Sequence, residues 1–521
     1  MNIIFTEYGK EAKLVEGRTI LSYLQELGID INAPCGGEGK CGQCQVEVKC
    51  APGALSDKTE AENEFAHEDT CRLACQAKIL KTDTPISVRV PRRTYYVLES
   101  GEYKEIALEP FVHIEGKRVF CESEDIGEYT GEIYGIALDI GTTTLAVYLI
   151  DLESGKVSSV ISRENPQTKY GNNVISRINF ARKRQDILER EIRTVANEMI
   201  ATLTDPGKVY EIVVVGNPVM RDLFFGYSVE SLGKSPYEPL REGAVSKTAK
   251  ELGLTVNPDT RVYGLPLIGS FVGADALAVV LATEMYKSEP VCMAIDIGTN
   301  TEIVLGNRER LMATSCAAGP AFEGAGISCG VGGVSGAIKE VSIENGEVMY
   351  KTIDDAAPVG VCGSGLIDAL AELLEKRIID GRGKFFGAEK EFKIAEGINL
   401  LEKDIDQLNL AKTAVAVGIK VLLERYEIEL EEIDSIFLAG GFVNFTNTEN
   451  AIRIGLLPDV EQEKVRKVGN AAIEGARQAL ISKTKREDAE AVAKRIKHVK
   501  LEEEENFMEI FVSELYFQKY L

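Results

Sequence analysis

The sequence predicts two different folds joined end to end, a small α+β module over residues 1–93 and a larger α/β region with two similar lobes. Six of the eleven cysteines fall between Cys35 and Cys75, in a stretch of short alternating strands. Further along the chain, apolar strand patterns alternate with helical ones, which is typical of an α/β fold. The segment around Asp139 is repeated around Asp296, and a repeat of this length indicates a duplicated lobe.

Within residues 1–93 we expect four strands and one helix. The strands alternate apolar and polar side chains, and the helix has apolar residues on one face and ends at a glycine. An acidic stretch lies between the third and fourth strands. The expected strands are 2–6, 11–15, 45–49 and 86–90, the helix is 20–28, and the acidic stretch is 57–69.

Three cysteines of this module, Cys35, Cys41 and Cys44, stand in a C-x5-C-x2-C pattern on one glycine-rich loop. Glycine lets backbone N–H groups turn toward sulfur and stabilise an added electron. Cys75, in the sequence Arg-Leu-Ala-Cys, supplies a fourth thiolate. The plant-type spacing is C-x4-C-x2-C, and the extra residue here resembles the adrenodoxin and bacterial-type [2Fe–2S] ferredoxins. The resemblance implies a ferredoxin-like (β-grasp) domain that holds one [2Fe–2S] cluster.

Zinc is the alternative metal, because C-x2-C pairs often bind it. Zinc ribbons use two such pairs, whereas Cys71 and Cys75 form C-x3-C, which favours the cluster. Cys71 stays open as a replacement for Cys75, and Cys50 as a more distant one. The acidic residues 60–69 form either a solvated face or a docking surface for a redox partner.

The composition is that of a soluble globular protein, and 521 residues are enough for about three domains. A net charge of −23 argues against nucleic acid or an anionic membrane as a partner. The longest apolar runs, such as 212–216 and 436–439, have the length of strands, and the N-terminus has no signal-peptide pattern. We therefore expect a cytoplasmic protein whose clustered cysteines bind metal. The scattered Cys292, Cys316, Cys329 and Cys362 are expected to be small buried residues.

The larger region divides into three parts. Residues 94–130 are mixed and charged and are expected to be a linker with some structure of its own. The first lobe is expected over 131–288 and the second, with a C-terminal extension, over 289–521. In the extension we expect a charged helix, a short strand at 498–501 and a final helix from Asn506.

Each repeat consists of an apolar strand, an aspartate, a Gly-Thr turn and a second apolar strand. Such a hairpin turn offers backbone N–H groups and threonine hydroxyls to phosphate. The aspartate at the strand end, Asp139 or Asp296, can hold Mg²⁺ through water. Two such hairpins facing across a cleft would clamp the β- and γ-phosphates of a nucleotide. The candidate phosphate-binding residues are Gly141, Thr142, Thr143 and Thr144 in the first hairpin, and Gly298, Thr299, Asn300 and Thr301 in the second.

A third element, residues 436–444, is a buried strand that ends in Gly440 and Gly441, where the backbone can approach an adenosine closely. In this order, the three elements resemble the phosphate-1, phosphate-2 and adenosine motifs of the actin/Hsp70/sugar-kinase ATPases. The resemblance implies a duplicated actin-like ATPase with ribonuclease H-like lobes, and ATP and Mg²⁺ as ligands. Residues 233–235 do not form a Walker A loop, because the leading glycine is absent.

Two residues are candidates for the base that activates water for attack on ATP. Asp275 lies in a Gly-Ala-Asp-Ala-Leu-Ala segment that resembles the Gly-Asp-x-x-Ala segment carrying the base of sugar kinases. Its alternative role is a helix N-cap. Glu302 is the second candidate.

A ferredoxin domain fused to this ATPase resembles one family along essentially the whole chain: the reductive activators of corrinoid proteins, found with corrinoid-dependent methyltransferases. The resemblance includes segments 165–177, 319–327 and 362–368. It implies ATP-dependent transfer of one electron from the cluster, which returns inactive Co(II) of a partner corrinoid protein to Co(I). It also implies an electron donor that the sequence does not identify, and by resemblance a homodimer. The chain has no cysteine after Cys362, so it lacks the C-terminal [4Fe–4S] clusters of one branch of the family.

Three other functions stay open. The first is an ATP-gated electron donor to another low-potential enzyme, as in the activators of 2-hydroxyacyl-CoA dehydratases, although those lack an N-terminal ferredoxin domain. The second is a small-molecule kinase with a ferredoxin appendage. The third is an electron carrier whose ATPase fold has decayed, which the intact Asp139 and Asp296 disfavour.

Overall fold

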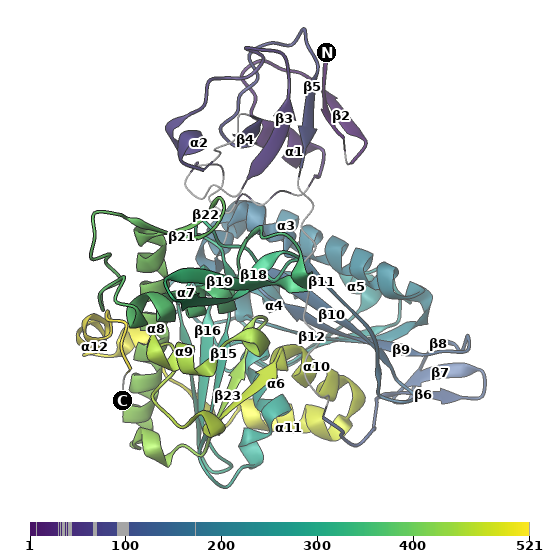
Figure 1. Cartoon of the computed structure of the whole chain (residues 1–521). Coiled ribbons are helices and arrows are strands. Elements are labelled where there is room, and N and C mark those ends of the chain that lie inside the picture. Colours follow the sequence, from purple (N-terminus) through teal and green to yellow (C-terminus); the bar gives the residue numbers. More distant parts are fainter. Residues whose placement is uncertain are drawn as a thin grey trace. The chain divides into compact units, whose positions relative to one another are not determined.

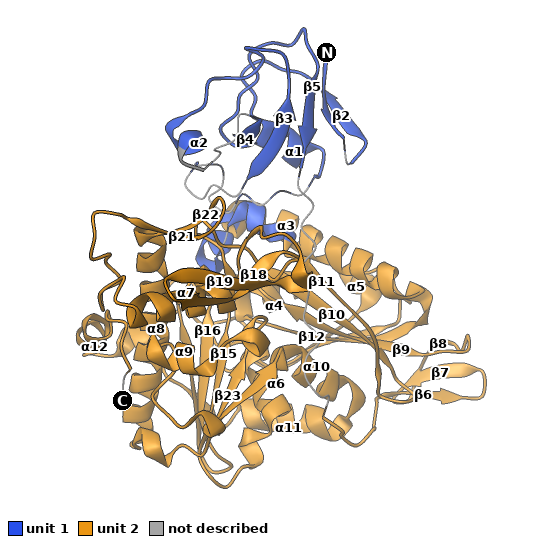
Figure 2. Ribbon diagram, viewed as in Figure 1, with its two compact units in different colours: residues 1–94, 166–180 blue, residues 95–165, 181–521 orange. Residues whose placement is uncertain are grey.

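The computed structural model describes residues 1–519 except 7, 30, 32, 34–36, 38, 40–43, 66–69, 91–103 and 172 (Figure 1). Two of the predicted cluster ligands, Cys35 and Cys41, lie outside the described residues. The chain forms two compact units (Figure 2). One contains residues 1–94 and 166–180, and the other contains residues 95–165 and 181–521.

The first unit contains a five-stranded sheet in the order β2-β1-β5-β3-β4. Helix α1 (Ile20–Glu26) begins after Thr19, whose hydroxyl accepts the Ser22 N–H, and ends before Gly28, which has a φ of +59°. The predicted strands and helix are present within two residues of their expected bounds, but the acidic stretch also contains a helix, α2 (Glu60–Phe65). The strands are β1 (Asn2–Phe5), β2 (Lys10–Lys13), β3 (Gln45–Lys49), β4 (Cys71–Leu73) and β5 (Ile86–Arg89).

The first lobe is built on a six-stranded sheet in the order β11-β10-β9-β12-β14-β13. β9, β10 and β11 form an antiparallel meander, and β12 then runs parallel to both β9 and β14. All eight residues of β12 are buried, as expected for an apolar strand in the centre of a sheet. The strands are β9 (Tyr134–Ile140), β10 (Thr144–Asp151), β11 (Val157–Glu164), β12 (Val209–Gly216), β13 (Val245–Thr248) and β14 (Arg261–Gly264).

The second lobe repeats this topology. Its sheet has the order β24-β23-β15-β16-β17-β25, in which β15, β16 and β17 form the meander and β23 lies parallel to β15 and β24. In both lobes the strands therefore follow the spatial order 3-2-1-4-5, with one additional edge strand. This confirms the predicted duplication. The strands are β15 (Cys292–Ile297), β16 (Thr301–Gly306), β17 (Leu311–Cys316), β23 (Ser435–Ala439), β24 (Val465–Gly469) and β25 (Ile496–His498).

Two C-terminal helices, α10 (Ala471–Ile481) and α11 (Lys483–Ala493), pack on the first lobe (Figure 1). α10 lies so close to α6 (Ala274–Thr283) that a Cβ at Gly475 would be 2.0 Å from the carbonyl oxygen of Ala278. Arg486 of α11 forms a buried ion pair with Glu211 of β12, with 2.8 Å between Nη1 and Oε1. The segment 471–493 therefore completes the core of the first lobe, which begins about 340 residues earlier, whereas the last described residues pack on the second lobe.

The expected linker, residues 94–130, is folded in its described part. It carries a small antiparallel sheet of β6 (Val112–Glu115), β7 (Arg118–Cys121) and β8 (Glu124–Glu128). In the C-terminal extension the strand expected at 498–501 lies instead at 496–498, because the side chain of Ile496 is buried where β25 pairs with Leu311 of β17. After Val499, which still bonds to Ala313, the chain turns into a short 3-10 helix.

The remaining elements surround these sheets. A second, three-stranded sheet has the order β19-β18-β20, and two antiparallel strands form β21 and β22. The helices are α3 (Val174–Leu203), α4 (Pro218–Phe225), α5 (Ala249–Leu252), α7 (Gly363–Glu375), α8 (Glu402–Tyr426), α9 (Thr448–Arg453) and α12 (Phe507–Ser513), and the strands are β18 (Ala337–Glu344), β19 (Glu347–Thr352), β20 (Gly360–Val361), β21 (Glu391–Ala395) and β22 (Ile398–Leu401).

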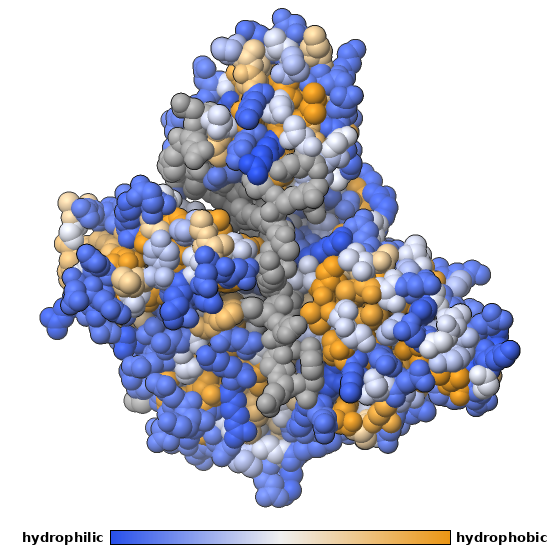
Figure 3. Space-filling view, turned by 45° about the vertical axis from the view of Figure 1, so that its right-hand side comes forward, coloured by the Kyte–Doolittle hydropathy of each residue, from blue (hydrophilic) through white to orange (hydrophobic). Residues whose placement is uncertain are grey.

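The face drawn in Figure 3 is mostly hydrophilic, with hydrophobic groups between the hydrophilic residues. Among the described residues, no helix combines the length and the apolar character that a membrane span requires.

Candidate nucleotide and cluster sites

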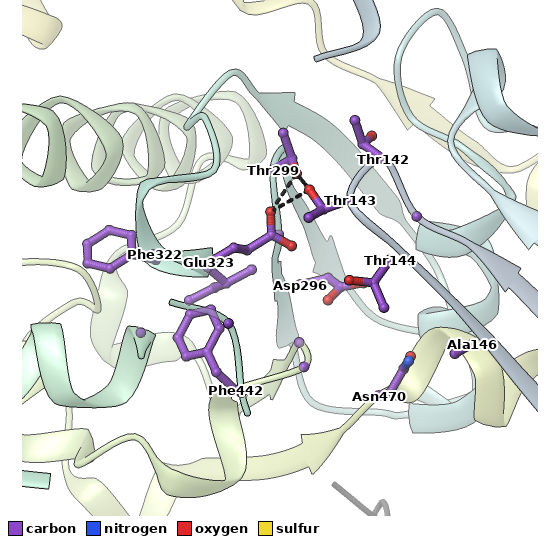
Figure 4. A pocket seen from close by; sticks show the side chains of 18 of the residues that line it. Thr142, Thr143, Thr144, Ala146, Asp296, Thr299, Phe322, Glu323, Phe442 and Asn470 are labelled. Atoms are coloured by element: carbon purple, nitrogen blue, oxygen red, sulfur yellow. Dashed lines mark hydrogen bonds between the residues drawn. The ribbon is translucent and has the colours of Figure 1, made fainter. Parts of the chain in front are cut away.

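A cavity of about 220 Å³ is lined by residues of both lobes (Figure 4). It brings together the two Gly-Thr hairpin turns, the glycine pair after β23, and both candidate bases. Thr301 is the exception, because its side chain is fully buried and does not line the cavity. The predicted residues that line it are Asp139, Gly141, Thr142, Thr143, Thr144, Asp275, Asp296, Gly298, Thr299, Asn300, Glu302, Gly440 and Gly441.

The first hairpin turn joins β9 to β10. It is closed by the Gly141 N–H, which donates to the carbonyl oxygen of Thr144 at 2.9 Å. A Cβ at position 141 would lie 2.6 Å from that same oxygen, so only glycine fits the turn. Asn165, which is fully buried, donates from Nδ2 to the Gly141 carbonyl at 2.8 Å and from its backbone N–H to the Thr143 carbonyl at 2.7 Å. Asn165 thus holds two carbonyls of the turn, and Asn217 holds the Thr142 hydroxyl oxygen, to which its Nδ2 donates at 3.0 Å.

The second turn joins β15 to β16, and the Gly298 N–H donates to the Asn300 carbonyl at 3.2 Å. Its aspartate, Asp296, stands directly across the hairpin from Glu302. Ser315 donates to Glu302 at 3.0 Å from the neighbouring strand β17. Both hairpins therefore present an aspartate at the end of the first strand and a hydroxyl-bearing turn after it, as the sequence predicts.

The two turns meet at a carboxylate that sequence reasoning missed. Glu323 accepts a hydrogen bond from Thr299 at 2.5 Å and another from Thr143 at 3.2 Å, both on Oε2 (Figure 4). The hydroxyl oxygens of the two threonines are 2.9 Å apart. One carboxylate thus occupies the point where hydroxyls from both lobes converge, which is the arrangement that a bound phosphate would need. Glu323 lies in the segment 319–327, whose Gly-Pro-Ala-Phe-Glu sequence was the available signal.

The aspartates of the cavity have pKa values far above their ordinary range. Burial raises the pKa of Asp139 to about 8, and the nearby charges of Asp275 and Asp296 add to the shift. Burial raises the pKa of Asp296 to about 7, with further contributions from Asp275 and Glu323. Carboxylates crowded in this way repel one another, and a bound cation would relieve the repulsion.

Asp275 does not act as the N-cap of α6, contrary to its alternative interpretation. The N-cap is Gly273, and Asp275 stands in the first turn, where its Oδ1 accepts the Ala276 N–H at 2.8 Å. A Cβ at Gly273 would lie 2.5 Å from this carboxylate oxygen, which explains the glycine. Burial raises the pKa of Asp275 to about 6 and that of Glu302 well above its ordinary value.

The other end of the cavity is more apolar. Gly440 has a φ of +132°, and a Cβ there would lie 2.5 Å from the Ile297 carbonyl oxygen, so glycine is required next to the second turn. Phe322 and Phe442 form part of the wall (Figure 4). An aromatic and glycine-lined surface of this kind suits the flat faces of an adenosine.

No group of three or more histidine, cysteine or carboxylate side chains in the described residues is arranged to hold a metal ion directly. The carboxylates of the nucleotide cavity are consistent with the expected alternative, a hydrated Mg²⁺ held through water near Asp139 and Asp296. Asn470 donates to Asp139 at 3.4 Å, which leaves the second carboxylate oxygen for such water.

In the first unit, the two described members of the predicted ligand set are close together and buried. Cys44 is 1 % exposed and Cys75 is 7 % exposed. The Ala74 N–H donates to the Cys44 carbonyl at 2.8 Å, so the two ligand-bearing segments are joined. Gln76 strengthens the link, because its amide nitrogen donates to the Gly37 carbonyl at 3.1 Å and to the Cys75 sulfur at 3.4 Å. Buried thiols that receive a hydrogen bond on sulfur fit an iron–sulfur cluster.

The acidic stretch is only partly a solvated face. Glu62 is fully buried and pairs with Arg72, with 2.8 Å between Oε1 and Nε. The same carboxylate accepts the Leu73 N–H at 3.1 Å. This pair anchors β4 three residues before Cys75, which gives a structural reason for the Arg-Leu-Ala-Cys sequence.

The alternative cysteines have other surroundings. Cys71 is half-buried and donates to Gln45 at 3.5 Å, and Cys50 is exposed. These contacts favour Cys75 as the fourth ligand. The scattered cysteines are buried as expected, and Cys362 also lines the cavity that holds the two Gly-Thr turns.

Three family models match the chain. The 2Fe-2S iron-sulfur cluster binding domain matches residues 5–80, the RACo middle region matches residues 134–288, and the C-terminal domain of RACo, described as the ASKHA domain, matches residues 290–520.

Among curated proteins, the corrinoid activation enzyme RamQ of Eubacterium limosum is 30 % identical over 98 % of this chain and 98 % of its own length. A [Co(II) methylated amine-specific corrinoid protein] reductase of Methanosarcina barkeri is 28 % identical over 74 % of this chain and 77 % of its own. Among solved structures, a reductive activator for corrinoid, iron-sulfur protein is 29 % identical with a TM-score of 0.74, over 99 % of this chain and 98 % of that one.

Proposed function

The chain belongs to the family of reductive activators of corrinoid proteins, and from this premise we propose that it uses ATP to return an inactive Co(II) corrinoid protein of a methyltransferase system to Co(I). One observation supports the ATP-dependent part most directly. Hydroxyls of two hairpin turns, one from each lobe, converge on a single point in a cavity that also contains the strand-end aspartates.

Residues 1–93 form the electron-transfer domain, and Cys35, Cys41, Cys44 and Cys75 hold its [2Fe–2S] cluster. When bound, the cluster supplies one electron at a low potential, near −400 mV in plant-type proteins. The chain keeps the cluster dry by burying the Cys44 and Cys75 thiols, and it places the Gln76 amide against a ligand sulfur. Burial and hydrogen bonding are two of the means by which proteins set cluster potentials.

The lobes, residues 131–288 and 289–521, bind ATP. The two Gly-Thr turns hold the β- and γ-phosphates, and the adenosine lies against Gly440 and Gly441. Asp139 and Asp296 hold Mg²⁺ through water, which offsets the mutual repulsion of the cavity carboxylates. Binding of ATP then changes the contacts between the lobes, and this change acts on the docked corrinoid protein.

The proposed surroundings of the reaction follow from the family and the composition. The corrinoid is carried by a partner protein, and a separate protein reduces the cluster. We place this protein and its two partners in the cytoplasm, and we expect this chain to form a homodimer. With a net charge of −23, the chain is expected to dock through neutral or basic surfaces of its partners.

The test is an anaerobic assay with the holoprotein, a reductant and a corrinoid protein held as Co(II), in which the absorbance of Co(I) is followed with and without ATP and Mg²⁺. Co(I) is expected to appear only with ATP, and Cys44→Ser and Asp296→Asn are expected to abolish it. Cys50→Ser and Asp259→Asn, both at exposed positions, are the matched controls and keep the activity. ATP-dependent phosphorylation of a small metabolite without Co(I) would contradict the proposal and favour a kinase.

A further inference from the structure

The position of Glu323 has a consequence for ATP hydrolysis. Its Oε2 accepts hydrogen bonds from Thr143 and Thr299, one from each of the two turns proposed to hold the β- and γ-phosphates, and we take the point where these hydroxyls meet as the γ-phosphate site. The two hydroxyl oxygens are also 2.9 Å apart, and either hydroxyl can donate to the other, so the two threonines and the carboxylate form one hydrogen-bonded cluster. A γ-phosphate that enters the cavity must take these two hydrogen bonds from Glu323.

The backbone around Glu323 is held in place by buried packing and a close backbone contact. Phe322 is 2 % exposed, and the short 3-10 helix Ala321–Glu323 ends at Gly324, which has a φ of +81°. A Cβ at Gly324 would lie 2.4 Å from the Val331 carbonyl oxygen, so the loop is fixed by a close backbone contact. Displacement by phosphate therefore rotates the carboxylate away from the threonines without removing it from the cavity.

The displaced carboxylate and the γ-phosphate are both negative and cannot lie in direct contact. A water molecule between them satisfies both, because it donates one hydrogen bond to the carboxylate and presents its oxygen lone pair to phosphorus. Glu323 would then lie one water molecule from the γ-phosphorus. This is the distance at which a general base acts.

The other carboxylates of the cavity have different surroundings. Asp139 and Asp296 stand at the ends of their strands, before the turns, in the positions expected for Mg²⁺. Asp275 accepts a backbone N–H of its own helix, and Glu302 accepts the hydroxyl of Ser315 behind the second hairpin. Among the described residues that line the cavity, Glu323 is the carboxylate that contacts the phosphate-binding threonines of both lobes.

We propose that Glu323 is a catalytic residue of this protein, the base that accepts a proton from the water attacking ATP. The assignment rests on the proposed function. In the step, the water oxygen forms a bond to the γ-phosphorus while the bond from that phosphorus to the β,γ-bridging oxygen breaks. One water proton passes to the Glu323 carboxylate, and the products are ADP and phosphate. The proton leaves with phosphate or solvent, which returns Glu323 to its ionised form.

The experiment compares Glu323→Gln with Glu323→Ala in the holoprotein, with the Co(II) corrinoid partner present. Glutamine still accepts hydrogen bonds from both threonines but cannot take a proton, whereas alanine loses both properties. ATP hydrolysis and the binding of a fluorescent, non-hydrolysable ATP analogue are measured separately. Glu347→Gln, at an exposed position of the second lobe, is the matched control and is expected to behave as wild type.

For a base, kcat is expected to fall at least about 100-fold in both variants, while the analogue binds to Glu323→Gln within about threefold of its wild-type Kd. If Glu323→Gln keeps kcat within threefold and Glu323→Ala changes only binding, the residue holds the turns together and the assignment is wrong. Glu323→Gln carries the decision if the alanine variant does not fold. A wild-type protein that neither binds the analogue nor hydrolyses ATP would overturn the proposed function itself, and this assignment with it.

Discussion

Replacement of Asp139 by asparagine is expected to abolish ATP-dependent activity and yet stabilise the empty protein above pH 7. Asp139 lies among other carboxylates in the nucleotide cavity, and its pKa is raised to about 8, first by burial and then by the charges of Asp275 and Asp296. The folded protein therefore binds this proton more tightly than the unfolded chain, in which the carboxyl has an ordinary pKa near 3.8. Stability that protonation provides at low pH is lost as the pH rises toward 8.

The size of the effect follows from the shift. At pH 7.5, a carboxyl with a folded pKa of about 8 and an unfolded pKa of 3.8 lowers the free energy of unfolding by at most about 5 kcal/mol. Asp139 is only half-buried on the cavity wall, and water there screens its charge. We therefore expect Asp139→Asn to gain about 1–3 kcal/mol in the absence of metal, which is a rise of roughly 1–3 °C in melting temperature for a unit of this size.

The assay is thermal unfolding of the holoprotein in EDTA at pH 6, 7 and 8, and again with Mg²⁺ and ATP. The advantage of Asp139→Asn over wild type is expected to grow from pH 6 to pH 8 and to reverse with Mg²⁺ and ATP, which stabilise only the carboxylate form. Asp259→Asn removes the same charge at an exposed site of the same lobe and is the control. If Asp139→Asn is less stable than wild type at pH 8 in EDTA, or if the difference does not change with pH, the reasoning about a strained carboxylate cavity is refuted.

Three further predictions concern individual contacts. Thr299→Val should weaken binding of an ATP analogue about 10- to 100-fold, because a hydrogen bond to a charged group is lost. Thr301→Val should change the Kd less than threefold, because that side chain does not line the cavity. Isothermal titration calorimetry measures both Kd values. Gln76→Leu should lower the midpoint potential of the cluster by about 20–60 mV and leave the visible spectrum unchanged, because the reduced cluster loses an N–H hydrogen bond to sulfur. A redox titration that gives an unchanged potential would contradict this. Cys75→Ser should lose the cluster, measured as iron per chain, and Cys71→Ser should keep it; the opposite result would exchange their roles.

Features that the sequence predicts well depend on residues close together in the chain. Each hairpin turn is encoded within about six residues, and Gly141 is recognisable because a tight turn with a close backbone contact excludes every side chain. The buried strand β12 is likewise visible in the sequence, as the apolar run 212–216 of strand length. The repeated sequence also predicts that the two lobes have the same strand order and that their equivalent hairpin turns face one cavity.

Features that the sequence could not predict depend on contacts between distant residues. Glu323 meets Thr143 across 180 positions, and although the segment 319–327 is part of the family resemblance, its local sequence does not show which residues this carboxylate contacts. Asn165 belongs to a segment that the sequence singles out. Its two hydrogen bonds to the first turn, however, can be predicted only if it is known that β11 ends beside that turn. The N-cap interpretation of Asp275 failed for a smaller reason, since Gly-Ala-Asp places two competent residues within one turn and packing against Asn217 selects Gly273.

The Thr143–Glu323–Thr299 contact also bears on how nucleotide controls the lobes. When the cavity is empty, the carboxylate links a turn of the first lobe to a turn of the second. If the proposed function holds, the γ-phosphate of bound ATP would take over both hydroxyls, and the carboxylate would return after phosphate leaves. On this proposal an anion links the two turns in both states, and ATP binding changes which anion does so and therefore the contacts between the lobes. A movement of the lobes that acts on the corrinoid partner would then accompany that exchange. The lobes would move when the γ-phosphate arrives and again when phosphate is released.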